Sequence, residues 1–254
     1  MEISLTGRTL LITGASSGIG ANFAGVAAAA GAKVVLGARR TDRLDVLVKE
    51  IKAKGGEAIA VKMDVSDHAS TVAAFDAAES AFGPVDSVIA NAGMSLDSPF
   101  LEHTGDEFDA LMAVNLKGVF LTVQEAAKRM MAAGSQTREH GRIVIISSIT
   151  AQAIEPGLAL YSASKAAVLQ MGKVLAREWA RKGINVNSVL PGYIMTEIND
   201  QWLTTEGGNK MIMRFPRKRV MDIDSLDPTL LYLSSDMSRF VTGVGFTIDD
   251  GQSL

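Results

Sequence analysis

Short runs of β-branched and aliphatic residues alternate with longer alanine- and leucine-rich segments along this chain. The apolar runs begin at Thr9, Lys33, Ala58, Ser87, Arg142 and Asn185, and a last run lies near Gly245 to Ile248. Most of them are apolar on both faces, as strands buried between two layers of helices must be. The segments between them predict helices at roughly 19–30, 42–54, 68–82, 106–132 and 160–182. The alternation predicts an α/β Rossmann fold, a doubly wound and mostly parallel sheet of seven strands with helices on both faces.

The chain is expected to form a single domain over residues 1–254, because no linker or internal repeat divides it. One long segment without a clear pattern, about 194–222, is longer than a normal connection and is typical of a lid over a binding site. Ligands of such sheets bind beyond the carboxyl ends of the strands, near the point where the strand order reverses.

Composition argues against several classes of function. The formal net charge is −3, so no basic face for nucleic acid is expected. The absence of cysteine removes disulfides and thiolate chemistry, and the three histidines are too scattered to predict a metal site. The segment from Met1 lacks the pattern of a secretory signal, and the small apolar stretch at 25–32 is too short to span a bilayer. A cytoplasmic protein without metal, membrane or nucleic-acid partners is therefore expected.

A glycine-rich turn follows the first apolar run directly. Glycines let a backbone adopt positive φ and approach a ligand closely, and the next helix offers unpaired N–H groups to a phosphate. A tight turn without a ligand would carry the same glycines, but a strand before and a helix after are the context of a dinucleotide site. The spacing Gly-x3-Gly-x-Gly resembles the turn of the short-chain dehydrogenase/reductase family. The resemblance implies that a nicotinamide dinucleotide binds at Gly14, Ser16, Ser17, Gly18, Ile19 and Gly20.

The end of the second apolar run bears on which nicotinamide cofactor binds. Enzymes that use NAD(H) need a carboxylate there to accept hydrogen bonds from the adenosine ribose. This chain has Arg39 and Arg40 at that place and no acid. Guanidinium groups pair well with a 2′-phosphate, which favours NADP(H) over NAD(H). The alternative is that both arginines are solvated residues at the start of the next helix.

Three further segments match the family's cofactor site. Asp64 and Val65 match the pair that contacts the adenine, although Asp64 alone could also be a turn or capping residue. Asn91-Ala92-Gly93 matches a turn that braces the sheet beside the cofactor, but Ala90 stands where the family usually has a second asparagine. The stretch that receives the nicotinamide carboxamide is matched by Pro191, Gly192, Ile194 and Thr196.

Tyr161 is the one tyrosine of three that has a lysine, Lys165, four residues later. Helical spacing places both side chains on one face. Ser148 ends the fifth run, thirteen residues before Tyr161. Singly these could be a packed tyrosine and a capping serine. Together they match the family's catalytic serine, tyrosine and lysine, and Asn115 matches its fourth member.

The chemistry explains the choice of side chains. Reduction of a ketone needs a hydride at carbon and a proton for the developing alkoxide, and Tyr161 is predicted to supply the proton. A free phenol has a pKa of about 10, which the ammonium of Lys165 is predicted to lower. Ser148 can hydrogen-bond to the carbonyl oxygen and stabilise its charge. The resemblance also implies that Lys165 holds the nicotinamide ribose and that Asn115 binds a water of a proton relay.

The substrate pocket is expected to draw on loops and on the segment at 194–222. Its candidate residues are Met94, Leu96, Thr150 to Ile154, Tyr193, Ile198, Trp202, Leu203, Met211, Met213 and Phe215. This set predicts a hydrophobic ketone or secondary alcohol as substrate, unless several members only pack the lid onto the body. The basic run from Arg214 to Arg219 could steer an anion or be a solvated loop.

Within the family the chain resembles the branch of 3-oxoacyl-carrier-protein reductases and general ketone reductases. That branch implies a homotetramer in which the helices at 106–132 and 160–182 pair between subunits. Reduction of a 3-oxoacyl group on a carrier protein or CoA is therefore one alternative function. Acidic Glu139 would repel an acidic carrier, whereas Lys128, Arg129 and Arg177 would attract it. An alternative of another class is a non-catalytic NADP-binding sensor or scaffold, against which the intact Ser148–Tyr161–Lys165 set argues.

Overall fold

The computed structural model describes residues 3–197 and 199–254. Its centre is one parallel sheet with the strand order β3-β2-β1-β4-β5-β6-β7. The strands are β1 (Thr9–Thr13), β2 (Lys33–Ala38), β3 (Glu57–Lys62), β4 (Ser87–Ala90), β5 (Gly141–Ile146), β6 (Ile184–Pro191) and β7 (Gly245–Ile248). Each neighbouring pair is parallel. The predicted fold class and the predicted strands are thereby confirmed, with strand bounds that shift by at most two residues.

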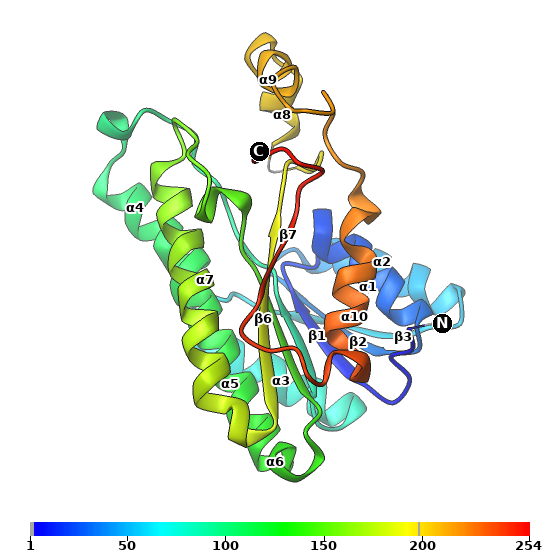
Figure 1. Ribbon diagram of the computed structural model, residues 1–254. Coiled ribbons are helices and arrows are strands. Elements are labelled where there is room, and N and C mark those ends of the chain that lie inside the picture. The colour runs from blue at the N-terminus through cyan, green and yellow to red at the C-terminus, as the bar shows by residue number, and fades with distance from the viewer. Residues whose placement is uncertain (1–2, 198) are drawn as a thin grey trace.

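Helices cover both faces of the sheet (Figure 1). One layer holds α1 (Gly18–Ala29), α2 (Thr41–Ala53) and α10 (Asp227–Ser234). The other holds α3 (His68–Phe82), α5 (Gly118–Ala132) and α7 (Ala159–Trp179). The described residues also contain four short α-helices: α4 (Gly105–Met112), α6 (Ser135–Arg138), α8 (Asp200–Leu203) and α9 (Glu206–Ile212).

The central strand β1 shows why the strands are apolar at every position. Successive side chains of a strand point to opposite faces. Leu10 and Ile12 therefore enter the core under α1 and α10, while Leu11 enters the core under α3 and α5. All three side chains are fully buried. A polar residue on either face would lie in one of the two cores.

The strand order reverses between β1 and β4, whose carboxyl ends lie side by side. Ligands of open α/β sheets bind at this crevice. The helices α8 and α9 stand at the same end of the molecule, as does the C-terminus (Figure 1). The topology therefore brings the glycine turn and the segments after β4, β5 and β6 to one edge.

The helix predicted at 106–132 is interrupted, which corrects the prediction of one continuous helix. A π-helical turn, Ala113–Lys117, separates α4 from α5. Asn115 lies in this turn and is fully buried. Single π-turns inside helices often occur at functional sites, because the wider turn redirects a side chain. Sequence periodicity does not distinguish such a turn from regular helix.

The segment at 194–222 is more ordered than predicted, since it contains α8 and α9. Leu203, Met211 and Phe215 pack together as a small apolar cluster within it. These three side chains serve the packing of the segment itself. No helix of the described residues is long and apolar enough to cross a bilayer.

Candidate active site

The glycine turn packs directly against the segment after β4. Gly14 and Gly18 have φ angles of +67° and +55°, which disfavour any side chain. A Cβ atom at Gly14 would lie 2.8 Å from the Cα of Ala92, and one at Gly20 would lie 2.7 Å from the Nδ2 of Asn91. The turn therefore needs glycine for its conformation and for this close approach.

Hydrogen bonds lock this contact in place. The Oγ1 of Thr13 accepts from the backbone N–H groups of Asn91 and Ala92, at 3.0 Å each. The Nδ2 of Asn91 donates to the carbonyl oxygen of Thr13 at 2.9 Å. Asn91 thus joins the ends of β1 and β4 without the second asparagine that Ala90 replaces.

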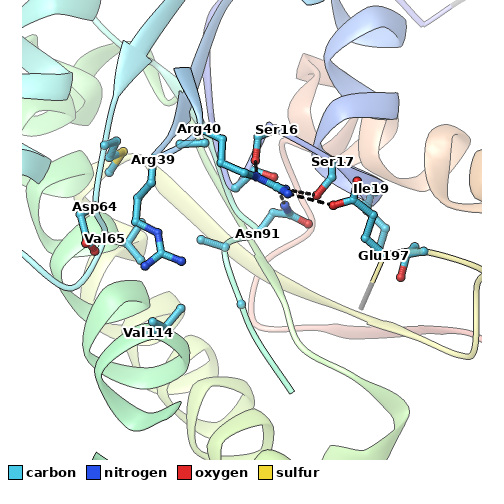
Figure 2. A pocket seen from close by; sticks show the side chains of 17 residues that line it. Ser16, Ser17, Ile19, Arg39, Arg40, Asp64, Val65, Asn91, Val114 and Glu197 are labelled. Atoms are coloured by element: carbon cyan, nitrogen blue, oxygen red, sulfur yellow. Dashed lines mark hydrogen bonds and ion pairs between the residues drawn. The ribbon is translucent and has the colours of Figure 1, made fainter. Parts of the chain in front are cut away.

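A cleft of about 380 Å³ opens between the turn and the ends of β2 and β3 (Figure 2). Its lining comprises Gly14, Ser16, Ser17, Gly18, Ile19, Ala38, Arg39, Arg40, Met63, Asp64, Val65, Asn91, Ala92, Gly93, Val114, Thr196 and Glu197. Thirteen of these were predicted as cofactor residues from the sequence. Ser17 precedes α1 without capping it through its side chain. The first N–H groups of α1 can therefore bind a phosphate.

The two adjacent arginines of the cleft differ in their contacts. Arg40 donates to the hydroxyls of Ser16 and Ser17, at 3.1 and 2.7 Å, and forms an ion pair of 3.0 Å with Glu197. Glu197 also pairs with Arg43. Arg39 extends away from this group toward Asp64 and Val65 (Figure 2). Among the described residues Arg39 has no hydrogen bond or ion pair, so its guanidinium is the better placed of the two to receive a 2′-phosphate.

Asp64 is held in a local turn beside Arg39. Its Oδ1 accepts from the N–H and the hydroxyl of Ser66, at 3.0 and 2.7 Å. The hydrogen bond from the Ser66 hydroxyl is the main reason why the pKa of Asp64 is lowered, and Arg39 adds to this effect. Asp64 is therefore an ionised hydrogen-bond acceptor at the rim of the cleft.

Ser148 is oriented as a hydrogen-bond donor. It caps the 3-10 turn Ile149–Ala151, and its Oγ accepts from the N–H and the hydroxyl of Thr150, at 3.1 and 3.0 Å. Both lone pairs of the oxygen are then engaged. The hydroxyl hydrogen of Ser148 can then be donated toward Tyr161, whose pKa a side-chain hydrogen bond from Ser148 lowers, or to a substrate oxygen that lies between the two hydroxyls.

Tyr161 and Lys165 lie one turn apart in α7, as their spacing predicts. The Nζ of Lys165 is 5.5 Å from the centre of the Tyr161 ring. It donates to the carbonyl oxygen of Ile146 at 2.9 Å, and the lysine is only 4% exposed. The sheet thus anchors the ammonium group beneath the tyrosine.

Burial dominates the proton affinities of this pair. It lowers the pKa of Lys165 to about 8 and raises the pKa of Tyr161 to about 12. Ser148 opposes the rise at Tyr161, and the negative charge of Asp97 adds to it. The ammonium of Lys165 is directed to the backbone of Ile146, and the predicted lowering of the Tyr161 pKa by Lys165 stays a prediction.

Asn115 positions the loop after β4. Its Nδ2 donates to the Met94 carbonyl and to the Ser164 hydroxyl, at 2.9 and 3.1 Å, and its Oδ1 accepts from the Met94 N–H at 2.9 Å. A Cβ atom added to Gly93 would lie 3.4 Å from the Nζ of Lys165 and 3.5 Å from the Oδ1 of Asn115. The two predicted relay residues, Asn115 and Lys165, therefore both lie beside Gly93.

Three adjacent cavities share lining residues. A chamber of about 120 Å³ is lined by Tyr161 and Lys165 and by all four residues of the predicted carboxamide segment. It shares Ile19, Asn91, Gly93 and Thr196 with the cleft. With a larger pocket of about 630 Å³ it shares Ser148, Tyr161, Pro191, Gly192 and Asn199. The hydroxyls of Ser148 and Tyr161 thus stand where a ligand of the cleft would meet a ligand of the pocket.

The lining of the larger pocket is mainly apolar, as predicted, but most of it comes from other residues than the predicted ones. Of its candidate residues only Thr150, Tyr193 and Trp202 line it, while Met94 lines the chamber. Ile154 and Met213 are solvent-exposed, and Ile198 lies outside the described residues. The pocket instead includes Asp97 and Glu155, which the sequence pattern did not single out. Both lie in irregular segments after strands, where no periodicity marks the direction of a side chain.

Two of the four basic side chains in the run from Arg214 to Arg219 share one carboxylate partner. Arg217 and Arg219 both pair with Asp250, at 3.0 and 2.8 Å. None of the residues from 214 to 219 lines the described pocket. The interpretation as a solvated loop fits this arrangement better than steering of an anion.

Comparison with known proteins identifies the family. Residues 8–207 match the family model described as short chain dehydrogenase. The chain is 34% identical over 249 residues to a gluconate 5-dehydrogenase of Gluconobacter oxydans (strain 621H), with 98% of this chain and 95% of that protein covered. It is also 34% identical over 248 residues to a 3-oxoacyl-(acyl-carrier-protein) reductase of Staphylococcus aureus (strain Mu50), with coverage of 97% and 98%.

A solved structure shares this fold. It is a gluconate 5-dehydrogenase from Burkholderia cenocepacia J2315 in complex with NADP and tartrate, 34% identical to this chain. The TM-score is 0.92, and 99% of this chain and 97% of that chain are covered. The family model covers most of the chain and these relatives match almost all of it, so the chain belongs to the short-chain dehydrogenase/reductase family of oxidoreductases.

Proposed function

We propose that the protein transfers a hydride between NADP(H) and a ketone or secondary alcohol. The observation that carries this proposal is that Ser148 and Tyr161 line both the chamber next to the dinucleotide cleft and the larger pocket. A carbonyl in the pocket would meet both hydroxyls. Oxidation of NADPH by a panel of aliphatic and aryl ketones, followed by nicotinamide absorbance, tests the proposal directly.

In this mechanism Ser148 donates its hydroxyl hydrogen to the carbonyl oxygen and stabilises the charge that develops there. Tyr161 then gives its proton to the alkoxide, as a general acid. A pKa of about 12 keeps Tyr161 protonated near neutral pH, which suits the reductive direction. Asn115 holds the Met94 backbone, and around Gly93 its oxygen and the Lys165 ammonium would border a water path that returns a proton to the tyrosine.

The residues of the cleft fit a nicotinamide dinucleotide phosphate. The uncapped start of α1 suits the pyrophosphate, Asp64 and Val65 suit the adenine, and Arg39 suits the 2′-phosphate. Pro191, Gly192, Ile194 and Thr196 border the chamber where the nicotinamide would lie. When bound, the cofactor supplies or accepts the hydride.

Replacement of Arg39 by aspartate is expected to reverse the cofactor preference. The new carboxylate would repel a 2′-phosphate and would accept hydrogen bonds from a ribose hydroxyl. We expect kcat/KM for NADPH to fall by about a hundredfold, the effect of losing a charge-assisted pair of about 3 kcal/mol, and kcat/KM for NADH to rise. Steady-state kinetics with both cofactors measure the change.

The matched control is Arg181→Asp, which makes the same charge change at an exposed residue outside the cleft. It should leave the ratio of the two kcat/KM values unchanged. A retained preference for NADPH in Arg39→Asp would mean that other groups, such as Arg40, recognise the 2′-phosphate.

The pH dependence of kcat/KM for NADPH should report Lys165. Burial disfavours the ammonium and lowers its pKa to about 8, so the group is charged below that pH and neutral above it. A neutral amine holds a ribose less strongly, so we expect kcat/KM to fall as the pH rises through about 8. Profiles measured from about pH 6 to about pH 10 report the free enzyme. A flat profile would show that the charge of Lys165 does not contribute.

A narrower alternative is reduction of a 3-oxoacyl group on a carrier protein, the activity in the name of one relative. The surface argues against this partner. Arg129 is already surrounded by Asp76, Glu79 and Glu125, each at 2.7 Å. Lys128 contacts Gln124 and Glu125. Two of the three basic residues expected to attract an acidic carrier are therefore engaged. Comparison of a 3-oxoacyl carrier protein with a simple ketone as substrate would decide between the two activities.

A non-catalytic NADP-binding sensor or scaffold is the alternative from another class. The hydroxyls of Ser148 and Tyr161 are aimed into a pocket that is large enough for a substrate, which a pure binding protein does not need. Binding of NADPH without turnover of any ketone or alcohol would favour the sensor.

A further inference from the structure

The wall of the larger pocket carries two carboxylates and no cation. Asp97 lies in the segment after β4, and Glu155 lies between β5 and α7. Both line the pocket together with the hydroxyl-bearing side chains of Tyr161 and Tyr193. None of the described residues that line it is lysine, arginine or histidine. The pocket therefore combines proton-donating chemistry with a negative wall.

The two carboxylates act on the hydroxyls around them. Burial is the largest cause of the raised pKa of Tyr193, and the negative charges of Glu155 and Asp97 raise it further. Asp97 also raises the pKa of Tyr161. Both effects have the sign of a negative potential at the place where a substrate binds. A bound anion would experience the same repulsion as a phenolate.

Glu155 has no direct partner of opposite charge among the described residues. It is partly buried, and burial raises the pKa of its carboxyl group. Arg214 acts on it electrostatically, but no ion pair or side-chain hydrogen bond joins Glu155 to any described residue. Asp97, by contrast, accepts a hydrogen bond of 2.9 Å from Ser95. A cationic group in the pocket would give Glu155 the partner that the protein itself does not supply.

Lys165, Arg217 and Arg219 are engaged elsewhere, and Arg214, which acts on Glu155 electrostatically, does not line the pocket. Lys165 lines the chamber beneath Tyr161 and donates to Ile146. Arg217 and Arg219 pair with Asp250. A carboxylate group on a substrate would thus enter the larger pocket without a counter-ion from its lining.

Aromatic rings complete the wall. Trp202 is 38% exposed, and the ring of Tyr193 packs against Phe215 with 5.6 Å between centroids. Both Trp202 and Tyr193 line the pocket beside the acids. Aromatic faces attract quaternary and protonated ammonium groups, and a carboxylate beside them strengthens the preference for a cation.

We propose that this pocket selects a ketone or secondary alcohol that carries an ammonium group, and that Asp97 and Glu155 determine this selectivity. The inference rests on the proposed function for its reaction. Substrates that carry a carboxylate, as hydroxy acids do, are disfavoured by the same two residues.

The test uses three methyl ketones of equal chain length that end in trimethylammonium, hydroxyl or carboxylate. Their kcat/KM values with NADPH are compared for the wild-type protein and for Asp97→Asn and Glu155→Gln. We expect each carboxylate to contribute about tenfold to the ammonium-to-carboxylate ratio, which corresponds to about 1.4 kcal/mol. Each single variant should lower this ratio by about tenfold. Glu57→Gln, at an exposed residue that begins β3 and lies outside the pocket, is the matched control and should not change it.

The outcomes separate the inference from the proposed function. If all three ketones are reduced and the ammonium-to-carboxylate ratio of kcat/KM is near one, the charge selectivity is overturned while the reductase activity stands. The same holds if both variants leave this ratio unaltered. If the hydroxyl compound has the highest kcat/KM, the pocket selects neutral polyols, and the proposed selectivity for an ammonium group is also overturned. If none of the three is reduced, calorimetric titration of the same compounds still ranks their binding. Tighter binding of the ammonium compound, weakened in Glu155→Gln, would then support the inference even though the proposed reaction fails.

Discussion

The variant Tyr161→Phe is expected to lose ketone reduction almost completely, with kcat reduced by about a thousandfold. The change removes only the hydroxyl that borders both the chamber and the larger pocket. Without it the alkoxide must take its proton from water, while Ser148 can still donate one hydrogen bond to the oxygen. The measurement is kcat for NADPH oxidation with a neutral ketone.

Tyr232→Phe is the matched control, because Tyr232 lies in α10, packs against the core on the other side of the molecule and lines none of the three cavities. It should retain the wild-type kcat. Both variants should bind NADPH as the wild type does, which separates loss of the proton donor from loss of the cofactor. Turnover by Tyr161→Phe within about tenfold of wild type would remove Tyr161 from the mechanism.

The variant Arg8→Met is expected to lower the free energy of unfolding by about 3–5 kcal/mol, the usual cost of leaving a buried charge without its partner. Arg8 is 5% exposed and donates to Asp86, Ser87 and the carbonyl of His140, at 3.1, 2.8 and 3.0 Å. It also pairs with Asp236 at 2.5 Å. These contacts tie the amino ends of β1, β4 and β5 together, at the edge opposite the candidate active site. Urea unfolding followed by circular dichroism measures the loss.

The destabilisation should depend on pH. Burial raises the pKa of Asp86 above its ordinary value despite the opposing charge of Arg8. A carboxyl group with a raised pKa in the folded state favours folding while it is protonated, and that contribution is lost as the pH rises through the folded-state pKa. The loss caused by Arg8→Met should therefore be smaller under acidic conditions, where Asp86 needs no counter-ion, than at neutral pH.

Arg43→Met is the control for this prediction, since it removes an exposed guanidinium whose ion pair with Glu197 is solvent-accessible. Exposed pairs contribute little, so its unfolding curve should almost coincide with that of the wild type. An Arg8→Met protein as stable as the wild type at neutral pH would mean that Asp86 is solvated or protonated in the folded state.

Local patterns in the sequence were sufficient for the fold. A strand buried on both faces must be apolar at every position, and the seven runs of this kind each became a strand. The glycine turn was equally readable, because the positive φ at Gly14 and Gly18 excludes most other residues. The spacing of Tyr161 and Lys165 was informative because helical geometry alone brings both to one face.

Several features were not readable because they depend on contacts between distant segments. The π-turn around Asn115 follows the same apolar pattern as regular helix. Leu203, Met211 and Phe215 resembled pocket residues, yet they pack on one another. Arg39 and Arg40 are neighbours in sequence, but only the positions of Ser16, Ser17 and Glu197 show that Arg40 is engaged and Arg39 is not.

The alternation of short apolar runs with helical segments by itself determined that this chain folds as a doubly wound α/β sheet, because burial on both faces imposes that pattern residue by residue. The tertiary structure alone decided what the edge of the sheet can recognise. It brought Asp97 and Glu155 into one pocket with Tyr161, and it buried Tyr161 deeply enough that desolvation is the main influence on the pKa of its phenol. The physical reason is that charge and solvation at the site are sums over segments far apart in the chain, which no local pattern contains.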